Sequence, residues 1–161
     1  ISQLVELVTK EGKSPKTEFV GKSAKYILDK IGITVGDDVK VILMEAKEDH
    51  PFVQVELMMP ILPLVRVPDV DQAIEMAVRV EHGNRHTAMM HSRNVEKLTK
   101  MAKLIQTTIF VKNGPSYAGI GVGGEGYTTF TIAGPTGEGL TSAKSFARRR
   151  RCVLVGGMDV R

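Results

Sequence analysis

The feature that most constrains the fold is an alternation of short apolar segments with amphipathic segments between residues 61 and 112. Two helices are predicted there, one over residues 70–81 with Asp69 as its N-cap and one that follows the N-cap Asn94 and runs through Ile105. Three apolar or β-branched segments around them are predicted to be strands: residues 61–67, 87–91 and 107–112. Strands that alternate with helices favour parallel pairing through right-handed crossovers. The fold class is therefore predicted to be α/β, with a parallel β-α-β-α-β sheet as its core.

The segments on either side of this core carry their own helix and strand signals. Before it, helices are predicted up to Val8, with Gly12 as the stop, and over residues 24–31, and a strand over residues 39–43. After it, a helix over about 138–147 and a strand over 152–155 close the chain. No internal repeat or low-complexity linker separates these elements, and 161 residues correspond to about one domain.

The composition excludes several classes of protein. With 42% hydrophobic and 25% charged residues, the chain lies in the range of ordinary globular proteins. The richest apolar stretch, Leu57 to Val67, is too short to span a bilayer. The single cysteine, Cys152, rules out an internal disulfide, which is consistent with a cytoplasmic location. The chain starts at Ile1 without a secretory signal, so we expect a fragment or a processed chain.

The positive charge of the chain is local. The formal net charge is +4, from 22 Lys and Arg against 18 Asp and Glu, and Arg148 to Arg151 alone supply four positive charges. Nucleic-acid binders spread positive charge over a face and interleave aromatic residues, whereas only 5% of these residues are aromatic. The arginine run is typical of a solvated helix end, and no nucleic-acid partner is expected.

Glycines mark one region as different from the rest. Nine of the sixteen glycines fall between Gly114 and Gly139, which predicts a long loop that serves a site or an interface. Two overlapping G-x-G-x-x-G matches lie in it: Gly119, Gly121 and Gly124, and Gly121, Gly123 and Gly126. A dinucleotide phosphate site needs a helix directly after the third glycine, whereas the β-prone run 127–131 follows here. The loop interpretation is therefore preferred.

Histidine and cysteine side chains offer weaker candidates for chemistry. Four residues of metal-binding types lie close together in the sequence: Glu81, His82, His86 and His91. Gly83 and Asn84 interrupt the helix that a zinc-binding pair would need. Cys152 follows four arginines, which favours a reactive thiolate, but it begins an apolar segment and has no nearby histidine to act as a base. No metal site is predicted.

Glu56 is the carboxylate that stands out. It lies in the otherwise almost entirely apolar segment 52–60, directly before the predicted strand over residues 61–67. A charge placed there must be paired, exposed at a cleft, or buried at a high cost in free energy. From the residues alone, a role in a site and a plain surface position are equally supported.

At this segment the chain resembles the aldehyde dehydrogenase superfamily. Residues 55–77, VELMMPILPLVRVPDVDQAIEMA, resemble its Glu-Ile-Phe-Gly-Pro-Val motif, followed by a strand and an Asp-x-x-x-Ala-Ile helix. Three stretches resemble the CoA-acylating branch, the acetaldehyde and propionaldehyde dehydrogenases of ethanolamine and propanediol utilisation: residues 81–94, 107–119 and 130–155. The last of these, FTIAGPTGEGLTSAKSFARRRRCVLV, is specific to that branch. The similarity also includes the opening residues 14–33. The resemblance covers nearly the whole chain.

The resemblance implies the reaction of this branch. A cysteine thiolate attacks a short-chain aldehyde, hydride passes to NAD, and coenzyme A takes the acyl group from the thioester. Glu56 matches the glutamate that hydrogen-bonds the nicotinamide ribose, and Pro60 matches the proline of the motif. Met58 and Met59 stand where the superfamily usually has phenylalanine and glycine.

The resemblance also implies an incomplete enzyme. The nucleophilic cysteine and the Rossmann-type cofactor domain belong to a part of the superfamily that precedes Ile1, so no catalytic residue is assigned in this chain. Residues 1–147 are then a partial catalytic domain, and residues 148–161 hold the strand that the superfamily uses in oligomerisation. Three residues of the glycine-rich loop are implied to line the substrate pocket: Phe130, Thr131 and Ile132.

Two functions stay open at this point. One is a portion of an acylating aldehyde dehydrogenase that is inactive alone and belongs to a cytoplasmic homo-oligomer, which in this branch can be packaged in a bacterial microcompartment. The other is a non-catalytic fragment that associates through the strand over 152–155, because an unpaired apolar edge strand pairs readily with another chain. NAD is the implied cofactor, and the acidic residue that separates NAD from NADP lies in the missing domain.

Overall fold

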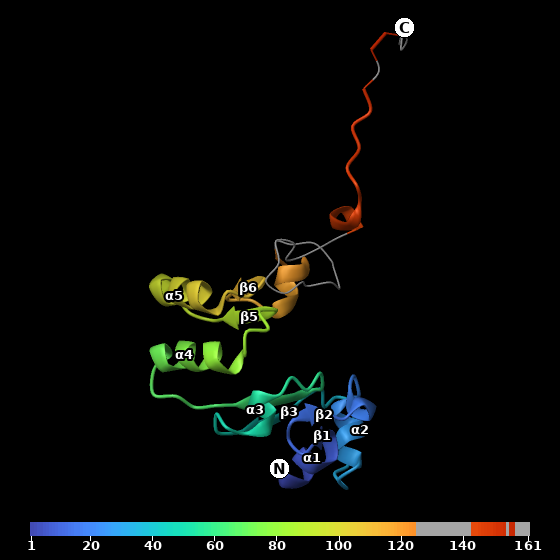
Figure 1. Ribbon diagram of the computed structural model, residues 1–161. Helices are drawn as coiled ribbons and strands as arrows, with labels where there is room; N and C mark the ends of the chain where they lie inside the picture. The colour runs from blue at the N-terminus through green and yellow to red at the C-terminus, as the bar shows by residue number, and fades with distance from the viewer. Residues whose placement is uncertain (125–142, 154, 157–161) are drawn as a thin grey trace. The chain divides into compact units, whose positions relative to one another are not determined.

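The computed structural model describes residues 1–124, 143–153 and 155–156. Contacts between residues divide the chain into two compact units, Ile1–Gly83 and Asn84–Arg161. Each unit contains one pair of parallel strands with helices beside it, as can be followed along the chain in Figure 1. No helix among the described residues is long and apolar enough to cross a membrane.

The first unit begins with a short helix and a tight hairpin. Helix α1 (Ser2–Val8) ends where Thr9 becomes extended, and strands β1 (Thr9–Lys10) and β2 (Ser14–Pro15) pair antiparallel. The buried Thr9 hydroxyl donates to the carbonyl oxygen four residues before it at 2.7 Å and accepts from the Gly12 amide at 3.0 Å. The buried hydroxyl is thus fully paired. The predicted opening helix is confirmed, although Gly12 lies in the hairpin and not at the helix end.

A second short helix is fixed by local signals at both ends. The 3-10 helix η1 (Thr17–Phe19) leads to α2 (Ala24–Asp29), where the Ser23 hydroxyl accepts from the Tyr26 amide at 3.2 Å. Gly32 follows with φ +76°, a left-handed conformation that glycine adopts without steric cost. Both predicted boundary residues are therefore confirmed, with the regular helix ending two residues before the predicted limit.

Strands β3 (Ile42–Glu45) and β4 (Ile61–Leu64) form the parallel pair of the first unit. The connection between them contains the short helix α3 (Pro51–Gln54), which packs against β4. The predicted strand over 39–43 is displaced, because the ladder with β4 begins only at residue 42.

One hydrophobic cluster holds the first unit together. Its buried members come from α1, η1, α2, α3, the two parallel strands and the segment between α3 and β4: Leu4, Val8, Phe19, Ile27, Met44, Phe52, Leu57 and Ile61. Val8 and Ile27 are completely inaccessible to solvent. Burial of such side chains is the main favourable contribution to folding, so the short helices depend on this cluster rather than on their own propensity.

Helix α4 (Val70–Val80) completes the first unit. The Asp69 carboxylate accepts from the Gln72 amide at 2.9 Å, which confirms the predicted N-cap. His82 and Gly83 then adopt left-handed conformations with φ of +54° and +76°, so the helix stops here. At its last turn, Arg79 forms two hydrogen bonds of 2.8 and 3.1 Å with the two carboxylate oxygens of Glu48.

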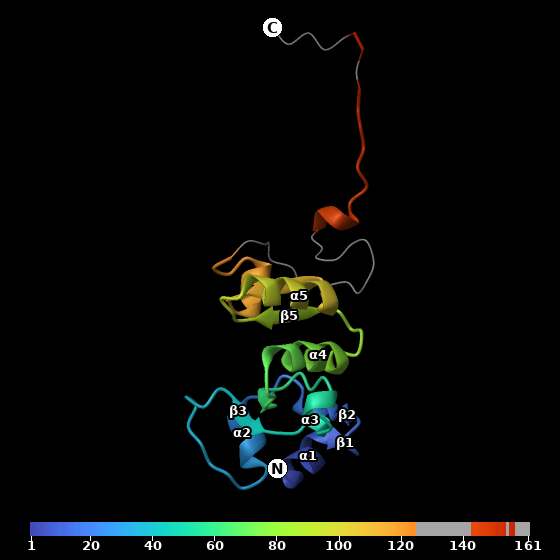
Figure 2. The same cartoon turned by 90° about the vertical axis from the view of Figure 1, so that its left-hand side faces the viewer.

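The second unit contains the βαβ unit predicted over residues 87–112. Strands β5 (Thr87–Met90) and β6 (Ile109–Lys112) pair in parallel, and α5 (Val95–Ile105) connects them. The predicted cap is confirmed, because the Asn94 side chain accepts from the Lys97 amide at 3.0 Å. Figure 2 shows α5 lying along β5, and three apolar side chains of the helix are buried: Leu98, Met101 and Ile105.

One continuous β-α-β-α-β sheet stays a prediction, because its strands fall in two units that are described separately. The order of elements is as predicted, and the observed pairing lies within each unit: β4 pairs with β3, and β5 pairs with β6. The chain passes from one compact unit to the other at Gly83, just after the end of α4. The α/β class itself is confirmed as two small parallel β-α-β units.

The two predicted C-terminal elements have different outcomes. Of the helix predicted over 138–147, residues 138–142 lie outside the described residues, and the 3-10 helix η3 (Ala143–Phe146) occupies part of the remainder. Cys152, Val153 and Val155 are exposed and belong to no strand in the described part of the chain. The oligomerisation strand over 148–161 stays a prediction.

Replacement of Ile27 by alanine tests the dependence of the first unit on its core cluster. The side chain is 0% exposed, whereas Ile33 in the following loop is 48% exposed. We expect Ile27→Ala to lower the free energy of unfolding by about 2–5 kcal/mol, because it leaves a cavity in the cluster. Ile33→Ala, the matched control, should cost less than about 1 kcal/mol. Urea denaturation followed by circular dichroism measures both, and equal losses would contradict this account of the core.

Acid titration tests the Glu48–Arg79 pair. The hydrogen bonds from Arg79 lower the pKa of the Glu48 carboxyl group below its usual value. The pair therefore stabilises the fold above the pKa of the unfolded carboxyl group, and the stabilisation is lost as the pH falls through the lowered folded value. We expect Arg79→Gln to return the pKa of Glu48 towards normal in an NMR titration of side-chain carboxyl carbons. Arg66→Gln, which removes a different surface pair, should leave the pKa of Glu48 where it is.

Candidate functional site

Glu56 is held in place by the residues on either side of it. Helix α3 starts at Pro51, and the His50 ring nitrogen Nδ1 accepts from the Phe52 amide at 3.1 Å. Phe52 and Leu57 are both buried, so the backbone is anchored before and after the glutamate. The Glu56 side chain is exposed and makes no ion pair within the described residues. Among the described residues Glu56 is therefore neither buried nor ion-paired, and its place in a cleft stays a prediction.

The residues after Glu56 depart from ordinary backbone geometry. Met58 has φ +54°, an uncommon conformation for a residue with a side chain, and its side chain is exposed. Its carbonyl oxygen accepts from the Gly21 amide at 3.1 Å, which ties the motif to the segment before α2. The left-handed residue is thus Met58, and not Met59, which occupies the usual glycine position of the motif.

An open pocket of about 610 Å³ lies beside this motif. One side is formed by the motif residues Met58, Met59 and Pro60. The other side is formed by two segments that are distant in sequence, residues 21–25 and Asp37 with residues 39–40. The parallel pairing of β3 with β4 brings Lys40, two residues before β3, near Pro60, directly before β4. The hydrogen bond from the Gly21 amide to the Met58 carbonyl oxygen adds residues 21–25.

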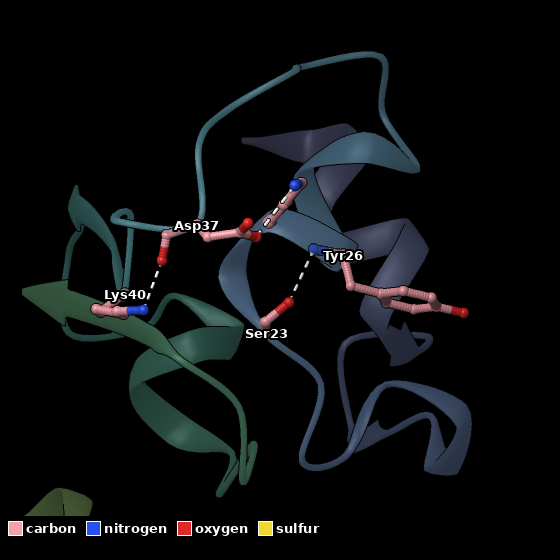
Figure 3. Close-up of polar contacts among 5 residues, drawn as sticks. Ser23, Tyr26, Asp37 and Lys40 are labelled. Atoms are coloured by element: carbon pink, nitrogen blue, oxygen red, sulfur yellow. Dashed lines mark hydrogen bonds and ion pairs between the residues drawn. The ribbon is translucent and has the colours of Figure 1, made fainter.

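Lysine side chains dominate the charge around this pocket. Lys25 Nζ lies 3.0 Å from the Asp37 carboxylate. Lys40 Nζ donates to the Asp37 backbone carbonyl at 2.5 Å, as Figure 3 shows. Lys22 is the third lysine of the pocket, and its ammonium group lies 5.5 Å from the centre of the Tyr26 ring. Three lysines against one aspartate make the pocket favourable for an anionic group.

Sequence reasoning missed this lysine cluster. Lys22 and Lys25 flank the helix cap Ser23, and Lys40 follows the turn at Asp37. The available signal is the spacing of these lysines around a cap and a turn. The three lysines come to line one pocket only when β3 pairs with β4, and neither the cap nor the turn predicts that pairing.

The predicted substrate-lining residues Phe130, Thr131 and Ile132 lie outside the described residues, as does most of the glycine-rich loop. The described start of that loop is compact and not extended. It contains the 3-10 helix η2 (Ser116–Ile120), which contacts β6.

The glycines of the first G-x-G-x-x-G match have packing reasons for their identity. A Cβ atom at Gly119 would lie 2.2 Å from the Ile109 side chain, and one at Gly124 would lie 2.8 Å from Ala118. Gly121 has φ +95° and ends η2. Close packing and a turn account for these three glycines, which supports the loop interpretation.

The metal-type and thiol candidates are not assembled into a centre within the part of the chain that the structure describes. No group of three His, Cys, Asp or Glu side chains is placed there to hold a metal ion. This includes the four residues close in sequence: Glu81, His82, His86 and His91. Cys152 is a free, exposed thiol.

Comparison with known proteins assigns the chain to a family. The profile of the aldehyde dehydrogenase family matches residues 39–138, which is more than half of the chain. The chain belongs to the aldehyde dehydrogenase family. The matched range includes both parallel strand pairs and the motif that contains Glu56.

Curated relatives place it near the CoA-acylating aldehyde dehydrogenases. It is 54% identical over 152 residues to propanal dehydrogenase (CoA-propanoylating) of Salmonella typhimurium, a match that covers 94% of this chain and 32% of the relative. It is 51% identical over 158 residues to acetaldehyde dehydrogenase (acetylating) EutE of Escherichia coli, covering 98% and 34%. The chain therefore spans about a third of the length of these relatives.

Solved structures of aldehyde dehydrogenases and related enzymes match its backbone. Propionaldehyde dehydrogenase of Rhodopseudomonas palustris with bound CoA and an acylated cysteine is 71% identical, with a TM-score of 0.87 over 95% of this chain and 35% of that chain. An engineered glycolyl-CoA reductase with bound NADP+ is 70% identical, with a TM-score of 0.87 over 99% and 36%. A propionaldehyde dehydrogenase from the fucose utilisation microcompartment of Clostridium phytofermentans is 50% identical, with a TM-score of 0.84 over 99% and 37%. The resemblance to the acylating branch is thus confirmed.

Substitution of Glu56 tests whether the stability of the fold depends on its carboxylate. Because the carboxylate is exposed and unpaired, Glu56→Gln should change the free energy of unfolding of the chain by less than about 0.5 kcal/mol. The neighbouring buried residue gives the control, since Leu57→Ala should cost about 2–5 kcal/mol. Chemical denaturation of the two variants measures both values. A large loss for Glu56→Gln would show that the fold itself needs the carboxylate.

Proposed function

We propose that this chain is the C-terminal portion of an NAD-dependent, CoA-acylating aldehyde dehydrogenase, which converts a short-chain aldehyde, CoA and NAD into acyl-CoA and NADH. The observation that carries the proposal is the 71% identity, over 95% of the chain, to a propionaldehyde dehydrogenase with bound CoA and an acylated cysteine. The names of the curated relatives add propanal and acetaldehyde as the aldehydes of this group.

The chain alone is proposed to be inactive. It spans about a third of its relatives, and its single cysteine, Cys152, follows the arginine run near the C-terminal end of the chain. The proposal therefore assigns the nucleophilic thiolate to the part of the enzyme that this chain does not match. No residue of the chain is given a bond-making role.

Glu56 is proposed to bind the dinucleotide. Its exposed carboxylate has free acceptor oxygens, and its backbone is anchored by Phe52 and Leu57, so the residue fits a partner that offers hydroxyl groups. A bound dinucleotide would accept hydride during the reaction, and CoA would accept the acyl group. Glu56 would hold the nicotinamide ribose by hydrogen bonds and fix its orientation. This ribose is the same in NAD and NADP, so the assignment also holds for the NADP+ found in one similar structure.

Four further assignments complete the proposal. Phe130, Thr131 and Ile132 would line the aldehyde pocket. Residues 1–147 would belong to the catalytic domain, and residues 148–161 would join subunits of a homo-oligomer. A microcompartment is the proposed setting, since one similar structure comes from such a compartment.

A chimera tests the function. In it, this chain replaces the third of the Rhodopseudomonas palustris propionaldehyde dehydrogenase that it matches. We expect CoA-dependent formation of NADH or NADPH from propanal by the chimera, and none by the chain alone. Glu56→Gln in the chimera should lower kcat/KM for the dinucleotide about 10- to 100-fold, because a hydrogen bond to a charged group contributes about 1.5–3 kcal/mol. Spectrophotometric initial rates measure both effects.

Glu6→Gln provides the matched control, since this exposed glutamate lies in α1, outside the motif that contains Glu56. It should leave the rate of the chimera unchanged. A folded chimera that binds CoA but reduces no dinucleotide with propanal would refute the proposed reaction. Unchanged dinucleotide kinetics in Glu56→Gln would refute the role of Glu56 alone.

A further inference from the structure

The side chain of Asn113 joins the ends of the two strands of the second unit. In the parallel register Met90 lies opposite Lys112, so β5 and β6 end side by side, and Asn113 follows β6 directly. Asn113 Oδ1 accepts from the Ser92 amide at 2.7 Å, and Asn113 Nδ2 donates to the Ser92 carbonyl oxygen at 2.9 Å. The Asn113 amide donates to the Met90 carbonyl oxygen at 3.0 Å. We call these three hydrogen bonds the Asn113 clamp.

The clamp continues into helix α5. Ser92 Oγ accepts from the Asn94 amide at 3.0 Å, and Asn94 is the N-cap of α5. The segment between β5 and α5 is therefore held by side chains at both of its ends. Asn113, which is 21 residues further along the chain from Ser92, holds it at the strand side.

The backbone of Asn113 sets the direction in which the chain leaves β6. Its φ of +56° is left-handed, an uncommon conformation that asparagine adopts more readily than most residues. After this turn η2 contacts both strands. A Cβ atom at Gly119 would lie 2.2 Å from the Ile109 side chain, and one at Gly114 would lie 3.3 Å from Val111. The place of η2 is thus fixed by the turn at Asn113 and by close packing on β6.

Asn113 stands between this rigid support and the glycine-rich region. Segments that follow the carboxyl ends of parallel strands commonly carry the binding residues of α/β proteins. Nine of the sixteen glycines lie between Gly114 and Gly139, directly after Asn113. Residues other than glycine that are held in a left-handed conformation collect at functional sites. Groups that bind a reacting molecule must also be held to within about 0.5 Å by the hydrogen bonds of their neighbours. The clamp supplies such support.

We propose that Asn113 is a positioning residue of the acylating reaction, which holds η2 where the aldehyde and the acyl group bind. The proposal rests on the proposed function, in which the glycine-rich loop meets the short-chain aldehyde. Asn113 acts through the Ser92 backbone and through η2, and it touches no reacting atom. Its loss therefore affects the aldehyde and the acyl group, and not the dinucleotide, which is assigned to Glu56 in the first unit.

Removal of the carboxamide in the chimera tests this role. Asn113→Gly deletes both side-chain hydrogen bonds, while glycine keeps the left-handed conformation without steric cost. We expect kcat/KM for propanal to fall about 10- to 100-fold, because small displacements of a binding segment are costly in rate. KM for the dinucleotide should not change. Asn113→Asp keeps the acceptor for the Ser92 amide but loses the donor, and it should show the same split if the glycine variant does not fold.

Gln106→Gly is the matched control. Gln106 is exposed and left-handed, with φ +50° at the end of α5, and its side chain forms no hydrogen bond within the described residues. The substitution therefore makes the same chemical change at the same kind of backbone without touching the clamp. It should leave the kinetics for propanal and for the dinucleotide unchanged.

Hydrogen exchange gives a readout that needs no turnover. The amides of Ser92 and of η2 should exchange faster in Asn113→Gly than in the parent chimera, and Gln106→Gly should match the parent. Propionyl-CoA should slow exchange in η2 of the parent chimera and have no such effect in Asn113→Gly. Mass spectrometry of peptides that contain these residues measures both effects.

The outcomes separate this inference from the proposed function. Equal losses for propanal and for the dinucleotide in Asn113→Gly would overturn the inference, because a general loss of folding affects both. Faster exchange with unchanged propanal kinetics would also overturn it, since the clamp would then serve the fold alone. So would an active chimera in which propionyl-CoA leaves η2 unprotected. An inactive chimera in which propionyl-CoA protects η2, with that protection lost in Asn113→Gly, would refute the reaction while supporting the inference.

Discussion

The pairing of β3 with β4 is the interaction on which the first unit depends. Their ladder is extended at its start by Pro60, whose carbonyl oxygen accepts from the Ile42 amide at 2.8 Å. The end of the motif that contains Glu56 is therefore part of the sheet. The hydrogen bond from Gly21 to Met58 attaches the approach to α2 to the same motif. One backbone network thus holds the sheet, the exposed carboxylate and the lysine pocket in a common frame.

The helices could be predicted closely because their signals are local. Ser23, Asp69 and Asn94 each accept a hydrogen bond from the amide three residues ahead, so a cap is decided within one turn of chain. Strand pairing is different, because β4 pairs with β3, which is separated from it by residues 46–60. An apolar run predicts that a strand forms, but it does not predict which strand pairs with it or in which register.

The candidate site shows the same difference between features set by local sequence and features set by long-range strand pairing. Glu56 could be singled out because a charge inside an apolar run is visible in the sequence, and family resemblance supplied a role for it. The pocket lysines could not, since Lys22 and Lys40 meet only after the strands have paired. The assignments of Phe130, Thr131 and Ile132 stay predictions, because they rest on resemblance and not on a described geometry.

The left-handed pair His82 and Gly83 has a consequence for synthesis on the ribosome. Every member of the core cluster of the first unit lies before this stop, from Leu4 to Ile61, and α4 ends just ahead of it. All members of this core cluster are therefore synthesised before any residue of the second unit. The contacts of the core cluster can thus begin to form during synthesis without waiting for residues beyond Gly83.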